Sequence, residues 1–179
     1  MMEPADAGLP DHADRASTPA SVGVTASPSA SLLIFMLGPL RLALHVEVVR
    51  EVVRAVAIAV LPRAPAIVEG VINVRGAIVP VLDIRSRFRL APESLHPDQH
   101  LIIAWAGVRL VGLRVDRATG FVTVERTAIE AAAPAVPGVE YVAGIARLPD
   151  GLLVINDLRG FLALDEAAQL DAATSDAGR

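Results

Sequence analysis

The first strongly hydrophobic stretch of the chain is an uninterrupted run of six apolar residues, 32–37, which a Gly-Pro pair ends. An apolar run of this length that stops at turn residues is typical of a β-strand with both faces buried. Leu40, Leu42 and Leu44 then alternate with other residues. This alternation predicts a second strand, and therefore a β-hairpin at the start of the folded part.

Short runs rich in β-branched residues continue along the chain, with Gly, Pro or Asp between them. Many short strands separated by frequent turns are typical of an all-β barrel or sandwich. Only two stretches favour a helix, a short one at 46–52 and one that begins near Asp157. The apolar runs that predict strands are 68–74, 77–84, 101–105, 108–115 and 121–124.

The sequence repeats itself at a spacing of about 70 residues. Gly70, Val71, Asp83, Ile84 and Arg85 recur 74 positions later as Gly144, Ile145, Asp157, Leu158 and Arg159. Leu32, Ile34, Gly38, Leu44, Val46 and Glu47 recur 69 positions later as Leu101, Ile103, Gly107, Leu113, Val115 and Asp116. The repeat predicts two related β units, at about 31–95 and 96–165.

Both ends of the chain lack hydrophobic periodicity. Residues 1–30 are rich in Ala, Ser, Pro and Asp, a composition that predicts a disordered tail. Residues 166–179 are small and polar, and we expect them to fray. The sequence has neither a sufficiently apolar stretch for a membrane span nor the basic start of a secretory signal. We therefore expect a cytoplasmic protein without direct membrane insertion.

Composition excludes several kinds of chemistry. The chain has no Cys, and all 16 of its basic residues are Arg, which removes disulfides, thiolate sites and a phosphate-loop lysine. Aromatic residues make up 3% of the chain and the net charge is −4, a balance that disfavours nucleic-acid binding even around Arg85, Arg87 and Arg89. The four histidines, His12, His45, His96 and His100, lack the tight spacing of metal ligands. We expect no metal and no cofactor.

The segment 70–85 is predicted to form two strands around a turn at Asn73, Arg75 and Gly76. Arg75 would offer its guanidinium either to a partner or to a local carboxylate. Asp83 and Asp157 each precede an apolar residue and an Arg, and we expect them to cap short helices. A small hydrolase that uses these two carboxylates is a remote alternative. No nucleophile, base and electrophile occur together, so the residues favour a binding module over an enzyme.

From Leu32 to about Leu164 the sequence resembles the CheW-like chemotaxis coupling family. The strongest likeness is the motif Gly-x-x-Asn-apolar-Arg-Gly at 70–76, which apolar-Pro-apolar-apolar-Asp-apolar-Arg follows at 79–85. The resemblance implies an all-β domain over 31–165 with one or two short helices, built as two tandem SH3-like five-stranded β-barrels. It also implies an adaptor that catalyses nothing.

The resemblance further implies two partners, the regulatory domain of a chemotaxis histidine kinase and the cytoplasmic tip of a methyl-accepting chemoreceptor, in arrays at the membrane-associated face of the cytoplasm. A non-flagellar chemosensory pathway, such as one for pilus motility, stays open as an alternative. Glu51 and Arg75 would be rim charges and Gly70 would admit a partner's backbone, whereas core packing is an equal alternative for Val49 and Phe121. The implied partner-binding residues are Val49, Glu51, Gly70, Arg75, Gly76, Gly112 and Phe121.

Overall fold

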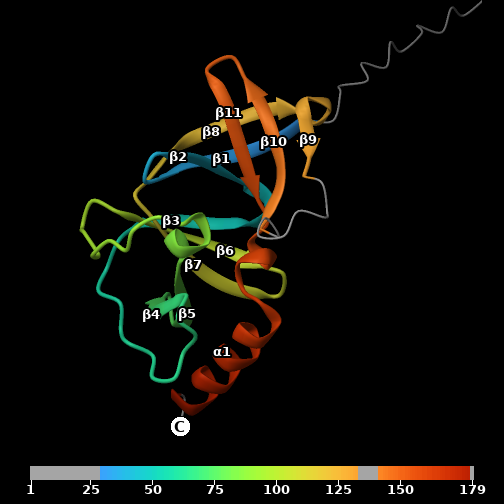
Figure 1. Cartoon of the computed structure of the whole chain (residues 1–179). Helices are drawn as coiled ribbons and strands as arrows, with labels where there is room; N and C mark the ends of the chain where they lie inside the picture. The colour runs from blue at the N-terminus through green and yellow to red at the C-terminus, as the bar shows by residue number, and fades with distance from the viewer. Residues whose placement is uncertain (1–28, 133–140, 178–179) are drawn as a thin grey trace, which may run out of the picture.

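The computed structural model of the protein describes residues 29–132 and 141–177 (Figure 1). The tail predicted over 1–30 lies outside these residues except for its last two, which begin β1. The strands are β1 (Ser29–Leu37), β2 (Leu40–His45), β3 (Val49–Arg54), β4 (Val68–Val74), β5 (Ala77–Asp83), β6 (His100–Ala106), β7 (Arg109–Val115), β8 (Arg117–Glu125), β9 (Ile129–Ala131), β10 (Val142–Leu148) and β11 (Gly151–Asn156). The helices are the 3₁₀ turns η1 (Val46–Val48), η2 (Ile84–Phe88), η3 (Arg126–Ala128) and η4 (Leu158–Phe161), and the α-helix α1 (Leu164–Ala177).

The strands form two sheets, as the sequence predicted for an all-β protein. The six-stranded sheet has the order β8-β1-β2-β11-β10-β9, and the five-stranded sheet has the order β3-β6-β7-β5-β4. In Figure 1 the six-stranded sheet lies above the five-stranded sheet, and α1 runs beside the lower one. Each sheet combines antiparallel hairpins with one parallel pairing, β2 with β11 and β7 with β5.

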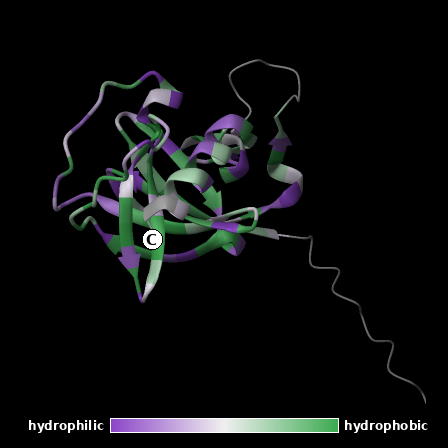
Figure 2. Ribbon diagram, turned by 90° about the horizontal axis from the view of Figure 1, so that it is seen from below, coloured by the Kyte–Doolittle hydropathy of each residue, from purple (hydrophilic) through white to green (hydrophobic). Residues whose placement is uncertain are grey.

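The first apolar run is buried on both faces, as predicted. Leu32 and Ile34 belong to a small core inside the six-stranded sheet. The alternate residues Leu33, Phe35 and Leu37 face the other way, into a larger core between the two sheets that we call the inter-sheet core. The side chains of a strand alternate between its faces, so an uninterrupted apolar run serves both cores at once. Figure 2 shows the resulting concentration of hydrophobic strands at the centre of the protein.

The strand β6 repeats this arrangement in the five-stranded sheet. Leu101 and Ile103 belong to a core enclosed by that sheet, whereas Ile102 and Ala104 face the inter-sheet core. The described residues therefore form three apolar cores, one within each sheet and one shared between the sheets.

The internal repeat is visible in the strand pairing. Pairs related by the sequence offsets occur in both sheets, namely Val49–Ala104 with Phe35–Ala118, and Val81–Gly112 with Ala43–Ile155. However, the expected units 31–95 and 96–165 do not form one sheet each. The hairpin β1–β2 pairs with β8 and β11 of the second unit, and the hairpin β6–β7 pairs with β3 and β5 of the first. Each of these hairpins is apolar on both faces. Its pairing with strands of the other unit helps to bury both of those faces.

The structure differs from two expectations, the helix at 46–52 and the frayed C-terminal segment at 166–179. Only Val46–Val48 of the expected helix at 46–52 is helical, because the following residues pair with β6 as the edge strand β3. Of the C-terminal residues, the described ones up to Ala177 belong to an ordered helix, α1 (Leu164–Ala177). Leu170 and Ala173 of this helix are buried in the inter-sheet core, and this tertiary contact stabilises a segment whose composition alone does not favour order. No helix within the described residues is long and apolar enough to cross a membrane.

Candidate docking surface

The turn between β4 and β5 has the geometry that its sequence predicts. Arg75 and Gly76 both have positive φ angles, 52° and 88°, as a two-residue hairpin turn requires. The side chain of Asn73 accepts a hydrogen bond of 2.8 Å from the backbone N–H of Gly76. This turn holds the Arg75 side chain in solvent, where it is 75% exposed.

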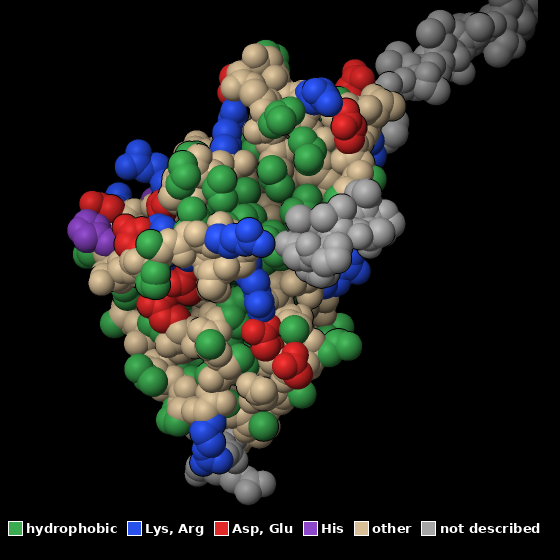
Figure 3. Space-filling view, viewed as in Figure 1, with side chains coloured by type: hydrophobic (Ala, Val, Ile, Leu, Met, Phe, Trp, Pro, Cys, Tyr) green, Lys and Arg blue, Asp and Glu red, His purple; other side chains and the backbone are tan. Residues whose placement is uncertain are grey.

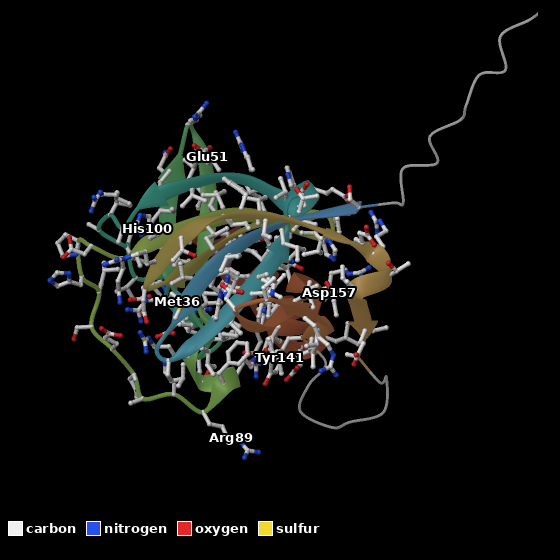
Figure 4. The ribbon with its side chains drawn as sticks, turned by 90° about the horizontal axis from the view of Figure 1, so that it is seen from above. Met36, Glu51, Arg89, His100, Tyr141 and Asp157 are labelled. Atoms are coloured by element: carbon white, nitrogen blue, oxygen red, sulfur yellow. The ribbon has the colours of Figure 1, made fainter. Side chains whose placement is uncertain are left out.

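Arg75 forms an ion pair with Glu51 of β3, with 3.1 Å between Nη2 and Oε2. The strands β3 and β4 are the two opposite edges of the five-stranded sheet, so this pair links the edges and helps to close the sheet into a barrel. Figure 4 shows Glu51 close to the β4–β5 hairpin. The Arg75 end of this pair is exposed, and ion pairs open to solvent contribute about 0–1 kcal/mol to stability. Breaking the pair so that Arg75 can bind a partner therefore costs little free energy.

Val49 and Phe121 lie at the rim of the inter-sheet core. Val49 is half-buried against that core, opposite Ala104. Phe121 of β8 is opposite Leu33, which belongs to the same core, but its own side chain is 69% exposed. Core packing, the alternative reading, therefore does not account for Phe121. The strand β8 contacts β6, the neighbour of β3. We call Val49, Glu51, Arg75 and Phe121 the rim surface.

Gly70 and Gly112 lie inside the fold and not on this surface. A Cβ atom on Gly70 would lie under 3.0 Å from the carbonyl oxygen of Ala59, whose backbone bonds to Val71. The backbone that packs against Gly70 is thus the chain's own segment at Ala59, and not that of a partner. Gly112 is buried in β7, where a Cβ atom would lie 3.3 Å from a methyl group of Ile103.

The structure contains a buried charge cluster that sequence reasoning did not identify. The side chain of Arg114 on β7 is only 4% exposed and forms ion pairs with Glu69, 2.7 Å from Nε to Oε2, and with Asp83. Arg114 also donates a hydrogen bond of 2.8 Å to the carbonyl oxygen of Glu93. Burial raises the pKa of the Glu69 carboxyl, and the neighbouring Arg114 opposes that rise. The available signal was an arginine within the apolar run 108–115.

The arginines at 85, 87 and 89, around which nucleic-acid binding was not expected, do not lie together on one exposed face. Arg85 is buried and pairs with Glu93 and Asp116. Arg87 bonds to the Phe161 carbonyl oxygen and to α1. Of the three, Arg89 is the one whose side chain points away from the protein in Figure 4.

Asp83 and Asp157 cap the two 3₁₀ turns as predicted. Each carboxylate accepts a hydrogen bond of 3.0 Å from the backbone N–H two residues later, Arg85 or Arg159. Each carboxylate also forms an ion pair with a different arginine, Asp83 with Arg114 and Asp157 with Arg159. The two carboxylates are therefore separate structural groups and not a catalytic pair. No group of His, Asp and Glu that could hold a metal occurs among the described residues.

A groove of about 540 Å³ lies where β2 ends, the β6–β7 turn passes and η4 begins, and we call it the η4 groove. Its lining includes His45, Glu47, Trp105, Asn156 and Asp157. The groove adjoins the rim surface, because η1 continues directly into Val49. A further apolar area, with Ile145 and Leu152 exposed, lies over the β10–β11 hairpin on the face shown in Figure 3.

Side-chain hydrogen bonds from Arg159 hold the pKa of Asp157 below its ordinary value of 3.8. A carboxyl whose pKa is lower in the folded state stabilises the fold above its unfolded pKa, and this contribution is lost as the pH falls through the folded pKa. We expect Asp157→Asn, which keeps the capping oxygen, to be less stable than the parent near neutral pH. The difference should shrink below about pH 4 in urea unfolding measured over a pH series. Asp150→Asn, at an exposed turn, is the control, and a difference that grows on acidification would contradict the assignment.

The family model for the CheW-like domain matches residues 31–166. This chain belongs to the CheW-like family. The chemotaxis protein CheW of Treponema pallidum is 26% identical over 145 residues, 78% of this chain and 85% of that protein. The CheW of Klebsiella aerogenes is 28% identical over 141 residues, with the same coverage of 78% and 85%. The crystal structure of the scaffolding protein TtCheW from Thermoanaerobacter tengcongensis matches with a TM-score of 0.71 at 28% identity, over 78% of this chain and 96% of that chain.

CheW-like proteins are adaptors of chemotaxis that carry out no catalysis, and this chain is accordingly a non-catalytic chemotaxis scaffold. The matched structure also supports the expected pair of SH3-like barrels. The site chemistry agrees with this role, since Asp83 and Asp157 are tied into structural ion pairs. What the surface offers instead is an exposed aromatic ring, an exposed guanidinium and an open groove.

Proposed function

We propose that this adaptor couples the regulatory domain of a chemotaxis histidine kinase to the cytoplasmic helical tip of a chemoreceptor through its rim surface. The observation that carries the proposal is Phe121, a large aromatic side chain left 69% exposed beside the inter-sheet core. The apolar face of a helix can occupy such a place in the helix-in-groove mode of recognition. In this proposal the chain works on the cytoplasmic side of the membrane, within a receptor array.

The Arg75–Glu51 pair supplies the polar part of the rim surface. Charges at the edge of an interface set partner choice and orientation more than they set raw affinity. Arg75 is held in solvent by a rigid turn, and a planar guanidinium can bind a partner carboxylate through two parallel hydrogen bonds. Gly76 contributes through the turn itself, because its φ of 88° is a conformation that glycine adopts without strain.

Arg75→Glu is expected to weaken binding to one of the two partners at least about tenfold, which corresponds to about 1.4 kcal/mol. The melting temperature should change little, since the Arg75 side chain is 75% exposed and water can solvate the new carboxylate. Isothermal titration of the full chain with the kinase regulatory domain, and separately with the receptor tip, measures the first quantity, and thermal unfolding measures the second.

Arg147→Glu is the matched control. Arg147 is an exposed arginine of β10 that pairs with Glu130 on the neighbouring strand, so the change in charge is the same but lies in the other sheet. It should leave both affinities unchanged. Absence of binding to either partner by the parent chain would refute the proposed function. A large fall in melting temperature for Arg75→Glu would show that Arg75 is structural.

A further inference from the structure

The η4 groove has a counterpart elsewhere in the same chain, related to it by the internal repeat. The offsets of 69 and 74 positions carry its lining residues onto a second set at the far end of the five-stranded sheet. Under these offsets His45 corresponds to Arg114, Glu47 to Asp116, Trp105 to Met36, Ala143 to Glu69, Asp157 to Asp83 and Arg159 to Arg85. The same offsets relate the strand pairings of the two sheets, so the two sets occupy equivalent places in the fold.

In the counterpart, two arginine side chains fill the space that corresponds to the η4 groove. The guanidinium of Arg114 lies between Asp83 and Glu69, and it is almost fully buried. Arg85 reaches across to Asp116, whose carboxylate also accepts a hydrogen bond of 2.5 Å from the backbone N–H of Gly38. Five charged groups thus fill the space that is open in the other copy.

The η4 groove keeps the acceptors of this arrangement but lacks its buried arginine. His45 stands in place of Arg114, and Ala143 in place of Glu69. Within the described residues Arg159 bonds only to Asp157, and its side chain is 73% exposed. Its guanidinium therefore does not fill the groove. The absence of the two larger side chains leaves the cavity of about 540 Å³.

An unused acceptor lies in the wall of the η4 groove. Asn156 is 3% exposed, and its amide nitrogen donates to the carbonyl oxygens of Ala43 and Val154. Its oxygen Oδ1 is buried and has no hydrogen-bond partner among the described residues. A buried acceptor without a donor costs free energy, which a ligand that brings an N–H group would recover. Asp157 and Glu47 add carboxylates to this groove, and their present partners, Arg159 and Arg126, are exposed side chains that can exchange with another cation. The groove therefore favours a ligand that is a cation rich in N–H donors.

We propose that the η4 groove binds an arginine side chain of a partner protein, whose guanidinium takes the place that Arg114 has in the closed copy. A guanidinium carries five N–H donors in one plane, which suits a carboxylate and a neighbouring amide oxygen together. Trp105, which is 44% exposed, lines the same groove, and an indole ring attracts a guanidinium placed over its face. The proposal rests on the proposed function, because it assigns one contact of the docking partner.

Trp105 is the single tryptophan of the chain, so its fluorescence reports on this groove alone. We expect ethylguanidinium, titrated into the full chain at constant ionic strength, to change that fluorescence saturably with a dissociation constant in the millimolar range, as expected for a small fragment. Asp157→Asn should weaken the response at least about fivefold, whereas the control Arg147→Gln should leave it unchanged. No saturable response, or an equal response to ethylammonium, would overturn the assignment to arginine.

A second variant tests the geometry by filling the groove from within the chain. His45→Arg combined with Ala143→Glu installs in the groove the arginine and the carboxylate of the closed copy. We expect a melting temperature no lower than that of the parent, loss of the ethylguanidinium response, and at least about fivefold weaker binding to one of the two partners. Unchanged partner binding by this folded variant would overturn the proposal.

The two proposals fail separately. The ethylguanidinium titration needs neither kinase nor receptor. A negative titration together with intact partner binding removes the arginine site alone. A positive titration without binding of either protein removes the proposed function and leaves a guanidinium site in the η4 groove.

Discussion

Replacement of Arg114 with methionine is expected to lower the free energy of unfolding by about 3–5 kcal/mol. The guanidinium is 4% exposed, and its partners Glu69 and Asp83 are themselves largely buried. Without Arg114 these two carboxylates lie close together in a poorly solvated place, and neither has another described cation beside it. For a chain of this size the loss corresponds to a fall in melting temperature of about 6–20 °C, which calorimetry or circular dichroism would detect.

Arg159→Met is the control for this prediction. Arg159 makes the same kind of ion pair with Asp157, but at the surface. Its loss should cost much less than that of Arg114, because water can solvate the remaining carboxylate. Equal melting temperatures for the two variants would show that the Arg114 cluster is not a stabilising element. The comparison also tests the difference between the closed and the open copies of the repeat, independently of any ligand.

Gly70→Ala is expected to lower the free energy of unfolding by about 2–4 kcal/mol. The new methyl group would collide with the carbonyl oxygen of Ala59, a backbone atom that cannot rotate away. The two backbone hydrogen bonds between Ala59 and Val71, 2.9 and 2.8 Å long, would have to lengthen or break. Urea unfolding measures the loss directly.

Gly112→Ala is the matched comparison, since the nearest atom there belongs to the Ile103 side chain, which can shift. We expect a loss below about 1.5 kcal/mol for this variant. If Gly70→Ala melted like the parent and yet failed to bind a partner, Gly70 would be a contact residue after all. If Gly70→Ala has a lower melting temperature than the parent, any loss of partner binding follows from damage to the fold.

The family and the kinds of local structure could be predicted because short stretches of sequence carry them. The apolar run at 32–37 predicts a doubly buried strand, and the turn at Arg75 and Gly76 follows from Asn73 and the glycine. The capping roles of Asp83 and Asp157 follow from position in the same way. Each of these features depends on residues within a few positions of one another.

The candidate site was predicted only in part, because exposure depends on residues far away in the sequence. The seven residues implied by the resemblance divide into a surface group, with Arg75, Gly76, Glu51, Val49 and Phe121, and an interior group, with Gly70 and Gly112. No local pattern separates Gly70 from Gly76, for both are glycines of one motif. The difference arises from the Ala59 segment, which packs beside Gly70 and leaves Gly76 in solvent.

The sequence by itself determined the β content, the hairpin turns, the twofold repeat and the family of this protein. Only the tertiary structure decided that the two units exchange hairpins, that a polar C-terminal segment becomes α1, and that one copy of a charged site is closed while the other is open. The reason is physical. The alternation of apolar residues specifies which faces must be buried, but the partner that buries each face is selected by packing across the whole chain.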